Sequence, residues 1–354
     1  MLLNMQIKLP YGKTFLTADA LFPDVTILEP RFIEGLADEA HAFTGAVRSP
    51  INARALREIV GRRDKVAVLV PDLTRPFPSH RVLPWFFKEL AHVPAGNFTV
   101  IIGTGSHRAN TPAELKEMLG AEIVARYRVV NHNSQDFQTM QPVGKREDGA
   151  LVCLNKEYVT ADRRIILGFI EPHFMAGFSG GYKAVMPGVA DINSILYYHR
   201  ASVVGDKRST WGVLKDNPTQ ELIQKLGALV PVDFCINVTL NRQRCITGFF
   251  CGDPKAAHLK GCKFAGASAM VSCSRYFPVV ITTNAGYARN PIMFFPRQCG
   301  EFGSQKAAAI LGRLRVCRAR MELSPMLRAA HPHPAQACLA FANPPPAETK
   351  FATR

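Results

Sequence analysis

The sequence predicts an α/β fold of two domains with mainly parallel sheets, an active site in the crevice between them, and an incomplete C-terminal domain. Three short apolar runs have the length and composition of buried parallel strands, and helical stretches separate them. These runs cover residues 65–71, 98–102 and 164–170. Strands that alternate with helices favour a parallel sheet with right-handed crossovers.

Capping signals indicate where the intervening helices begin. After a first segment with short strand-like pieces, Ser79 can cap a helix that ends near Leu90. Thr111 begins a second helix, because it forms a capping box with Glu114 and proline stands at the first helical position. Residues 126–130 add a further strand candidate.

The pattern changes twice along the chain. We predict an N-terminal cofactor-binding domain over residues 1–205 and a partial C-terminal α/β domain over 206–287. The second segment contains two paired strands, a helix and a buried strand, over residues 232–240, 244–250, 253–270 and 278–283. The last segment, 288–354, is an atypical basic tail with eight prolines and no Asp. Two interpretations remain open for it: a disordered tail, or a reading-frame change near Tyr287 that replaced the native C-terminus.

The composition narrows the class of protein. An apolar fraction of 47% and a charged fraction of 20% are those of a soluble globular protein. The first residues lack the order of a secretory signal and no apolar run is long enough for a membrane helix, so we expect a cytoplasmic protein without a membrane partner. Nine cysteines form no C-x-x-C pair, which argues against a disulfide framework or a thiolate zinc site.

The net charge of +15 would suit an acidic partner such as nucleic acid. Its distribution weakens that interpretation. The last 67 residues hold ten Lys or Arg against three Glu, so nearly half of the surplus lies in under a fifth of the chain. We therefore expect no nucleic-acid partner.

Chemistry-bearing side chains follow the predicted strands. In a parallel sheet the turns after successive strands lie at one edge, so residues 72–75, 103–107 and 172–183 should converge. The segment 171–189 is the richest, with one imidazole, one hydroxyl, three close glycines and the amine of Lys183. His199 follows on a helix that Asp191 can cap. An alternative is a tight turn that only needs positive φ, with a structural His and a solvated Lys.

Two histidines on separate turns, His107 and His173, suit an acid/base pair that exchanges protons near neutral pH. Arg75 can hold a carboxylate in a two-pronged contact, or it is a surface arginine. Lys183 is either an electrostatic clamp or a covalent nucleophile. His199 is either a metal ligand or a structural residue beside two tyrosines.

Five motifs occur together in this chain: LPYGK at 9–13, DLTRPFP at 72–78, GTGSHR at 103–108, EPHFMAGFSGGYKAVMPGV at 171–189 and ITTNAGY at 281–287. In this order, and with a His on the helix after the fourth, they resemble the nickel-pincer lactate racemase family (LarA-like). The resemblance covers residues 1 to about 287. It implies an isomerase that racemises or epimerises a small 2-hydroxy acid by hydride transfer, with two His acid/bases and a nickel pincer nucleotide cofactor.

The resemblance also implies a role for each matching residue. Lys183 would carry the cofactor as a thioamide, and cofactor-synthesising enzymes would be partners of the chain. His199 would complete the nickel coordination, as imidazole and soft sulfur suit nickel in a square-planar site. His107 and His173 would be the acid/base pair on the two faces of the substrate. The remaining positions would line the cofactor, with Arg75 also near the substrate carboxylate: Asp72, Leu73, Thr74 and Arg75.

The chain departs from the family pattern after Tyr287. Family members continue with a segment whose Tyr-Gln pair and Lys contact the substrate, and residues 288–306 do not align with it. An alternative function follows from this departure: a catalytically impaired relative that binds the cofactor or nickel only. The sequence does not specify which 2-hydroxy acid is the substrate.

Overall fold

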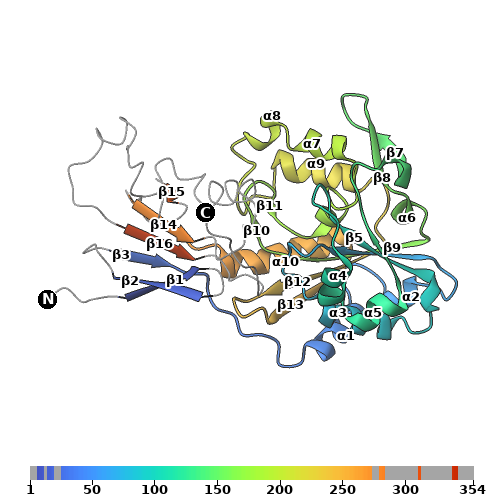
Figure 1. Ribbon diagram of the computed structural model, residues 1–354, viewed down its shortest axis with the longest axis horizontal. Helices are drawn as coiled ribbons and strands as arrows, with labels where there is room; N and C mark the ends of the chain where they lie inside the picture. Colours follow the sequence, from blue (N-terminus) through green and yellow to red (C-terminus); the bar gives the residue numbers. More distant parts are fainter. Residues whose placement is uncertain are drawn as a thin grey trace. The chain divides into compact units, whose positions relative to one another are not determined.

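The computed structural model describes residues 6–11, 14–19, 25–272, 279–283, 310–311 and 337–341 (Figure 1). The chain divides into two compact units, one of Ile33–Ala267 and one of Met1–Phe32 with Ser268–Arg354. None of the helices in the described ranges is both long and apolar enough to cross a membrane.

A six-stranded sheet forms the centre of the Ile33–Ala267 unit (Figure 1). Its strand order is β13-β12-β9-β4-β5-β6, and every neighbouring pair is parallel except β12 with β13. The strands span Val66–Pro71 (β4), Phe98–Gly103 (β5), Arg128–Asn131 (β6), Arg163–Phe169 (β9), Phe234–Leu240 (β12) and Ile246–Gly252 (β13). The predicted α/β class with mostly parallel strands is confirmed.

Ten α-helices and three 3₁₀ turns lie in the described part of the chain. The capping box predicted at Thr111 is present, with Thr111 and Glu114 bonded reciprocally to each other's backbone. Ser79 is not a cap: Pro78 holds that position, and Ser79 is the first helical residue. The elements are α1 Glu39–Arg48, α2 Leu56–Ile59, α3 Ser79–Glu89, α4 Pro112–Leu119, α5 Ala121–Arg126, α6 Lys156–Val159, α7 Ile192–Tyr198, α8 Ala201–Val204, α9 Pro218–Gly227, α10 Pro254–Ala269, η1 Ala95–Asn97, η2 Phe137–Thr139 and η3 Gly181–Ala184.

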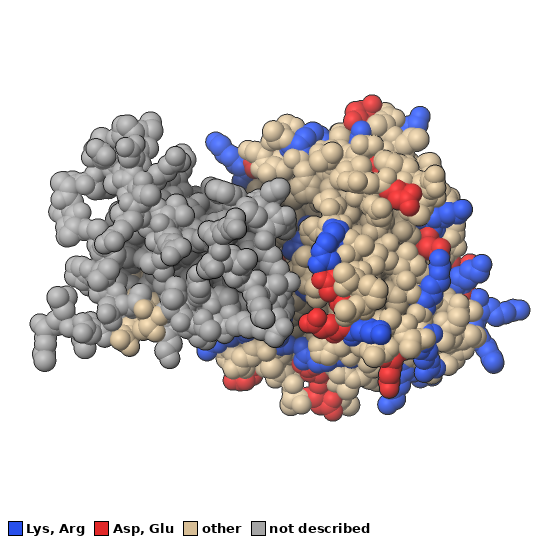
Figure 2. Space-filling model, in the orientation of Figure 1, with Lys and Arg blue, Asp and Glu red and all other residues tan. Residues whose placement is uncertain are grey.

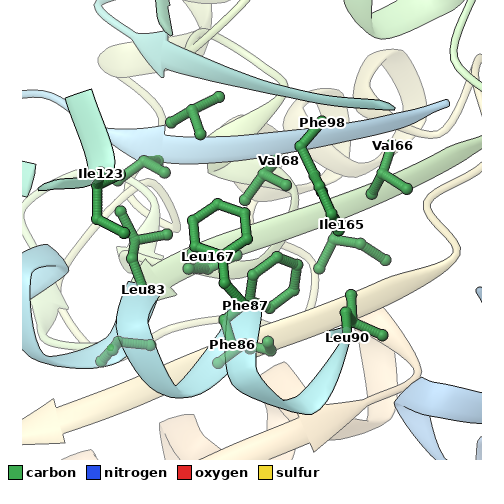
Figure 3. Packing of buried hydrophobic residues seen from close by; sticks show 14 of the residues in the cluster. Val66, Val68, Leu83, Phe86, Phe87, Leu90, Phe98, Ile123, Ile165 and Leu167 are labelled. Carbon is green, nitrogen blue, oxygen red and sulfur yellow. The ribbon is translucent and has the colours of Figure 1, made fainter. Parts of the chain in front are cut away.

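The central sheet is buried on both faces. Successive side chains along each strand point to opposite sides, and each side packs against its own hydrophobic cluster. Figure 3 shows one face, where Val68 and Leu167 meet the aromatic rings of α3. Phe87 of α3 also stacks on Tyr127 with ring centroids 3.6 Å apart. The alternate strand residues, such as Leu69, pack on the other face against residues drawn from 175–226. Residues between 175 and 226 therefore cover this second face.

The strands expected at 232–240 and 244–250 form and pair with each other as β12 and β13. They do not start a sheet of their own, since β12 pairs in parallel with β9, with Asn237 opposite Gly168. The predicted boundary at 205/206 thus falls inside one compact unit. Two hairpins complete this unit: β7 Met140–Lys145 with β8 Leu151–Asn155, and β10 Pro172–His173 with β11 Gly177–Phe178.

The other unit contains a hairpin and a small parallel sheet. β1 (Gln6–Tyr11) pairs antiparallel with β2 (Thr14–Asp19). The four-stranded sheet has the order β15-β14-β16-β3, and the strand predicted at 278–283 is its member β14. The strands span Val25–Leu28 (β3), Val279–Thr283 (β14), Ile310–Leu311 (β15) and Ala337–Phe341 (β16). Apart from β15 and β16, the predicted tail 288–354 lies outside the described residues.

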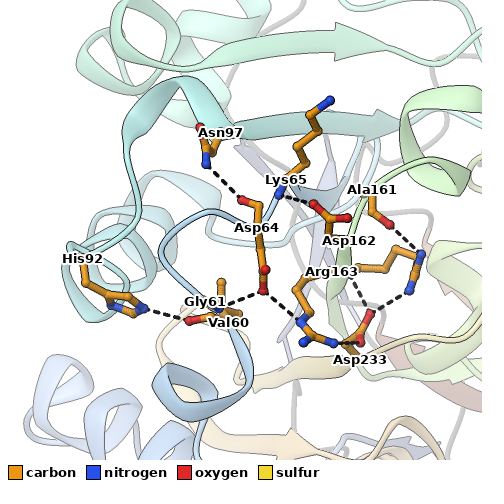
Figure 4. Close-up of polar contacts among 11 residues, drawn as sticks. Val60, Gly61, Asp64, Lys65, His92, Asn97, Ala161, Asp162, Arg163 and Asp233 are labelled. Carbon is orange, nitrogen blue, oxygen red and sulfur yellow. Dashed lines mark hydrogen bonds and ion pairs between the residues drawn. The ribbon is translucent and has the colours of Figure 1, made fainter.

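Charged side chains join three strands of the central sheet at their amino-terminal ends (Figure 4). Arg163 binds Asp64 with Nε 3.0 Å from Oδ2, and Asp233 with Nη1 3.2 Å from Oδ1. The backbone N–H of Lys65 donates to Asp162 at 2.8 Å. Elsewhere on the face shown in Figure 2, Lys and Arg lie interspersed with Asp and Glu. The amino edge of β4, β9 and β12 is therefore a paired, structural edge.

Candidate functional site

The turn after β5 packs against the end of the segment 171–189 at the carboxyl edge of the sheet. Gly105 N–H donates to the carbonyl of Gly188 at 3.0 Å. A Cβ on Gly188 would lie 1.9 Å from the carbonyl oxygen of Ala184, so only glycine fits there. His132 supports both segments: its backbone carbonyl accepts from Thr104 Oγ1 at 2.6 Å, and its ring donates to the Ala190 carbonyl at 2.9 Å. The turn after β5 thus meets the end of the segment 171–189, beyond the turn predicted at 172–183.

A buried carboxylate orients His107. Its Nδ1 lies 2.7 Å from Oδ2 of Asp72, and the hydroxyl of Thr74 donates to the other oxygen at 2.7 Å. Burial would raise the pKa of Asp72, but the hydrogen bond and charge of His107 and the charge of Arg75 outweigh it and lower that pKa. Because Asp72 is ionised, Nδ1–H is the donor and the lone pair of the neutral ring lies on Nε2. His107 is therefore held as a base.

His173 lies on the β10–β11 hairpin, opposite Gly177. Its Nδ1 accepts the backbone N–H groups of Ala176 at 3.2 Å and Met175 at 3.4 Å. Gly177 has a φ of +74°, and a Cβ there would lie 2.1 Å from the backbone of Val213. Since Nδ1 accepts, the proton of the neutral ring is on Nε2. His173 therefore presents a hydrogen-bond donor, unlike His107.

Lys183 stands in η3, two residues after Gly181, and both Gly180 and Gly181 have positive φ. It is half-buried. Removal from water and the positive charge of Arg75 lower its pKa to about 7, against the opposing effect of Glu171. A large fraction of the amine is therefore uncharged at neutral pH and able to act as a nucleophile.

His199 follows α7, whose N-cap is Asp191 as predicted. Its Nδ1–H donates to the carbonyl of Ile195 at 2.8 Å, which leaves the lone pair on Nε2. Partial removal from water and then the positive charge of Lys183 lower the pKa of His199, with the Ile195 bond opposing them. A neutral, exposed imidazole with this tautomer is a suitable metal ligand.

The positive charge of Arg75 affects the pKa values of three neighbouring groups. Its charge acts on Asp72, on Lys183 and on Tyr198. The hydroxyl of Tyr198 is buried and has no hydrogen-bond partner within the part of the chain that the structure describes. Leu73 is partly buried and packs against the hydrophobic cluster on the sheet face that α3 covers. The edge therefore combines a base, an amine, an imidazole and an unsatisfied hydroxyl.

A family model described as "Lactate racemase N-terminal domain" matches residues 11–212, more than half of the chain. The chain belongs to the lactate racemase family. Lactate racemases from Thermoanaerobacterium thermosaccharolyticum and Lactiplantibacillus plantarum are 32% and 31% identical to it over 287 and 288 residues. Each alignment covers 79% of this chain and 67% of the relative.

A solved structure agrees with this membership. The lactate racemase apoprotein from T. thermosaccharolyticum superposes with a TM-score of 0.73 at 31% identity, over 79% of this chain and 66% of that one. A Thermotoga maritima protein with a TM-score of 0.60 is only 20% identical, over 72% of this chain and 66% of that one, and shares the fold alone. The chain spans about two thirds of the length of the racemases it matches.

Sequence reasoning missed three buried polar residues that support this racemase-family site. Asn217 donates to the carbonyl of Met175 at 2.9 Å and so supports the His173 hairpin. Asn237 and His258 contact the turn before Lys183. None of the three belongs to a recognised motif. The one available signal was a polar residue within an apolar strand, in the run FCINVTL that carries Asn237.

Proposed function

We propose that this chain is a racemase or epimerase of a small 2-hydroxy acid, with lactate as the first substrate to test. Membership of the lactate racemase family supports an isomerase. The observation that carries the proposal is the 2.7 Å contact between His107 and the buried carboxylate of Asp72, at the same sheet edge as Lys183. A base held in this way suits removal of the proton from a substrate hydroxyl.

The residues present fit a nickel pincer nucleotide. An amine with a pKa near 7 suits covalent attachment at Lys183. The Nε2 lone pair of His199 suits nickel, because Nδ1–H is already bonded to a carbonyl. The buried hydroxyl of Tyr198 has no hydrogen-bond partner among the described residues and would bond to such a cofactor. Held by Lys183 and His199, such a cofactor would supply reversible hydride transfer at the substrate Cα. The positions proposed to line it are Asp72, Leu73, Thr74 and Arg75.

The side chains of this chain then orient the substrate and move its hydroxyl proton. Arg75 binds the carboxylate. His107 accepts the hydroxyl proton at Nε2, and Asp72 stabilises the imidazolium that forms. His173 contacts the substrate oxygen from the opposite face through Nε2–H. To serve as the base for the other enantiomer, His173 gives up the two N–H contacts at Nδ1 and moves its ring proton there.

A second candidate function is a relative that binds the cofactor or nickel without turnover. The absence of the substrate-contacting family segment from residues 288–306 favours it. The two candidates share Lys183 and His199 and differ in whether the substrate hydroxyl is deprotonated.

Protein co-produced with the cofactor-building enzymes distinguishes the candidates. Intact mass and nickel content are measured for the unaltered chain and for Lys183→Ala. A covalent adduct with stoichiometric nickel, lost in Lys183→Ala, is expected for the racemase and for a relative that binds the cofactor. Lactate racemisation that disappears when His107 and His173 are both changed to Ala supports the racemase. An adduct or bound nickel without racemisation supports the second candidate, and protein with neither an adduct nor nickel contradicts both.

A further inference from the structure

The turn that precedes Lys183 is held by two buried side chains that belong to none of the five motifs. Residues 179–181 form this turn, and both glycines in it have positive φ. The side chains belong to Asn237 on β12 and His258 on α10, which are 1% and 4% exposed. Both lie beyond residue 212, where the family model ends.

Asn237 fixes the second half of the turn. Its Oδ1 accepts the backbone N–H of Gly181 at 3.1 Å, and its Nδ2 donates to the sulfur of Cys235 at 2.6 Å. A Cβ on Gly180 would lie 2.9 Å from the same Oδ1. The amide therefore touches both glycines, and its orientation is set by the bond to Cys235.

His258 fixes the first half of the turn. Its Nε2–H donates to the carbonyl of Ser179 at 2.8 Å. Burial and then the positive charge of Lys183 lower the pKa of His258, while the Ser179 bond opposes this shift, so the ring is neutral. A Cβ on Gly181 would lie 2.8 Å from the imidazole, so the ring packs directly against the turn. The contacts of Asn237 and His258 leave the turn no room to shift.

We propose that His258 and Asn237 are positioning residues that hold the amine of Lys183 in place for covalent attachment of the cofactor. The inference rests on the proposed role of Lys183, but the geometry of the turn does not depend on it. If the turn loosens, water reaches the amine and the charged form is favoured, so the amine loses reactivity at neutral pH. At pH 7, a rise in the pKa of Lys183 from about 7 to about 8 lowers the uncharged fraction of the amine from about one half to about one eleventh, which is about fivefold.

The test measures the reactivity of Lys183 in protein without cofactor. Acetic anhydride is added at pH 7, and the labelling rate of Lys183 is compared by peptide mass spectrometry with that of Lys116, an exposed lysine on α4. His258→Gln places an amide N–H where Nε2–H stands, whereas His258→Asn is too short to reach Ser179. Cys262→Ala is the matched control. Its sulfur lies 3.3 Å from His258 Nε2 and is equally buried on the same helix, but the Ser179 bond is kept.

The expected pattern is a fall of about fivefold in relative labelling for His258→Asn, the effect of a one-unit rise in the pKa of Lys183, with His258→Gln and Cys262→Ala within about twofold of the unaltered chain. Thermal unfolding of each variant is recorded. If His258→Asn does not fold, Asn237→Ala takes its place, with the same fall expected. Unchanged labelling in the folded variant that loses its bond to the turn overturns the proposal. A fall in Cys262→Ala as large as in His258→Asn also overturns it. Because no cofactor or substrate is added, the result is independent of whether the chain racemises lactate.

Discussion

Replacing Asp72 by Asn tests whether His107 is a base held by its neighbour. The hydroxyl of Thr74 donates to Oδ1 of Asp72, and Oδ2 faces Nδ1 of His107. In Asp72→Asn the amide oxygen accepts from Thr74, so the NH₂ group faces His107. Nδ1 must then accept, and the ring proton moves to Nε2, the atom that should take the substrate proton. Size and packing are unchanged, but the tautomer is wrong.

The cost combines the wrong tautomer with the loss of the negative charge that stabilises the imidazolium. We expect racemisation by cofactor-loaded Asp72→Asn to fall by about 10²- to 10⁴-fold. Chiral chromatography of lactate measures the rate, and imidazole ¹⁵N NMR of the protein without cofactor measures the tautomer of His107 directly. Within the same NMR spectrum His173 is the control, because its Nδ1 contacts are to backbone N–H groups and should not change.

A second substitution makes the test sharper. Thr74→Val in the Asp72→Asn background removes the donor that fixes the amide, so the amide can turn its oxygen to His107. The Nδ1–H tautomer should return, and the double variant should racemise lactate about tenfold faster than Asp72→Asn alone. An Asp72→Asn protein with activity within threefold of the unaltered chain and the tautomer unchanged would refute the reasoning.

Three further perturbations have defined outcomes. Gly177→Ala places a Cβ 2.1 Å from the backbone of Val213 at a φ of +74°. We expect the unfolding free energy, measured by urea titration, to fall by at least about 2 kcal/mol. A fall of less than about 0.5 kcal/mol would contradict this expectation. Asp233→Ala removes the partner of Arg163 and of the backbone N–H of Arg164, and should cost about 1–2 kcal/mol because Arg163 is 39% exposed and screened by water. Folding lowers the pKa of Lys183 to about 7. Between pH 7 and the ordinary lysine pKa, the unfolded chain therefore binds more protons than the folded chain. Stability should rise with pH across this interval. Lys183→Met should therefore raise the Tm at pH 7 and flatten this rise, and an unchanged or lower Tm would contradict the assigned burial of charge.

The sequence predicts those parts of the fold that are encoded locally. The apolar runs at 65–71, 98–102 and 164–170 became β4, β5 and β9, and the capping box at Thr111 began α4 where expected. The partner of a strand is not encoded in this way. The pair β12–β13 was predicted, but nothing in its residues indicates that β12 extends the sheet from β9, because a parallel neighbour leaves no turn signal between them.

The same distinction applies to the site. The sequence placed His107 and Lys183 in the chemistry-bearing turns and His199 on the helix that follows, and the resemblance assigned their roles. The resemblance placed Asp72 at the cofactor, and in the structure the carboxylate of Asp72 bonds to His107, 35 residues away. His258 could not be found by pattern at all, because its bond to Ser179 spans 79 residues and depends on how α10 packs.

The position of β12 has a consequence for anyone who exchanges or isolates parts of this chain. The segment that the family model matches ends at residue 212, before β12 and α10. A fragment cut there would expose the backbone N–H and C=O groups along one side of β9, an open template for association with other chains. It would also lose the amide and imidazole that grip the turn before Lys183. Strand pairing therefore sets the smallest fragment that keeps this site intact. That fragment extends through α10, well past His199, the last residue with a proposed role in the chemistry.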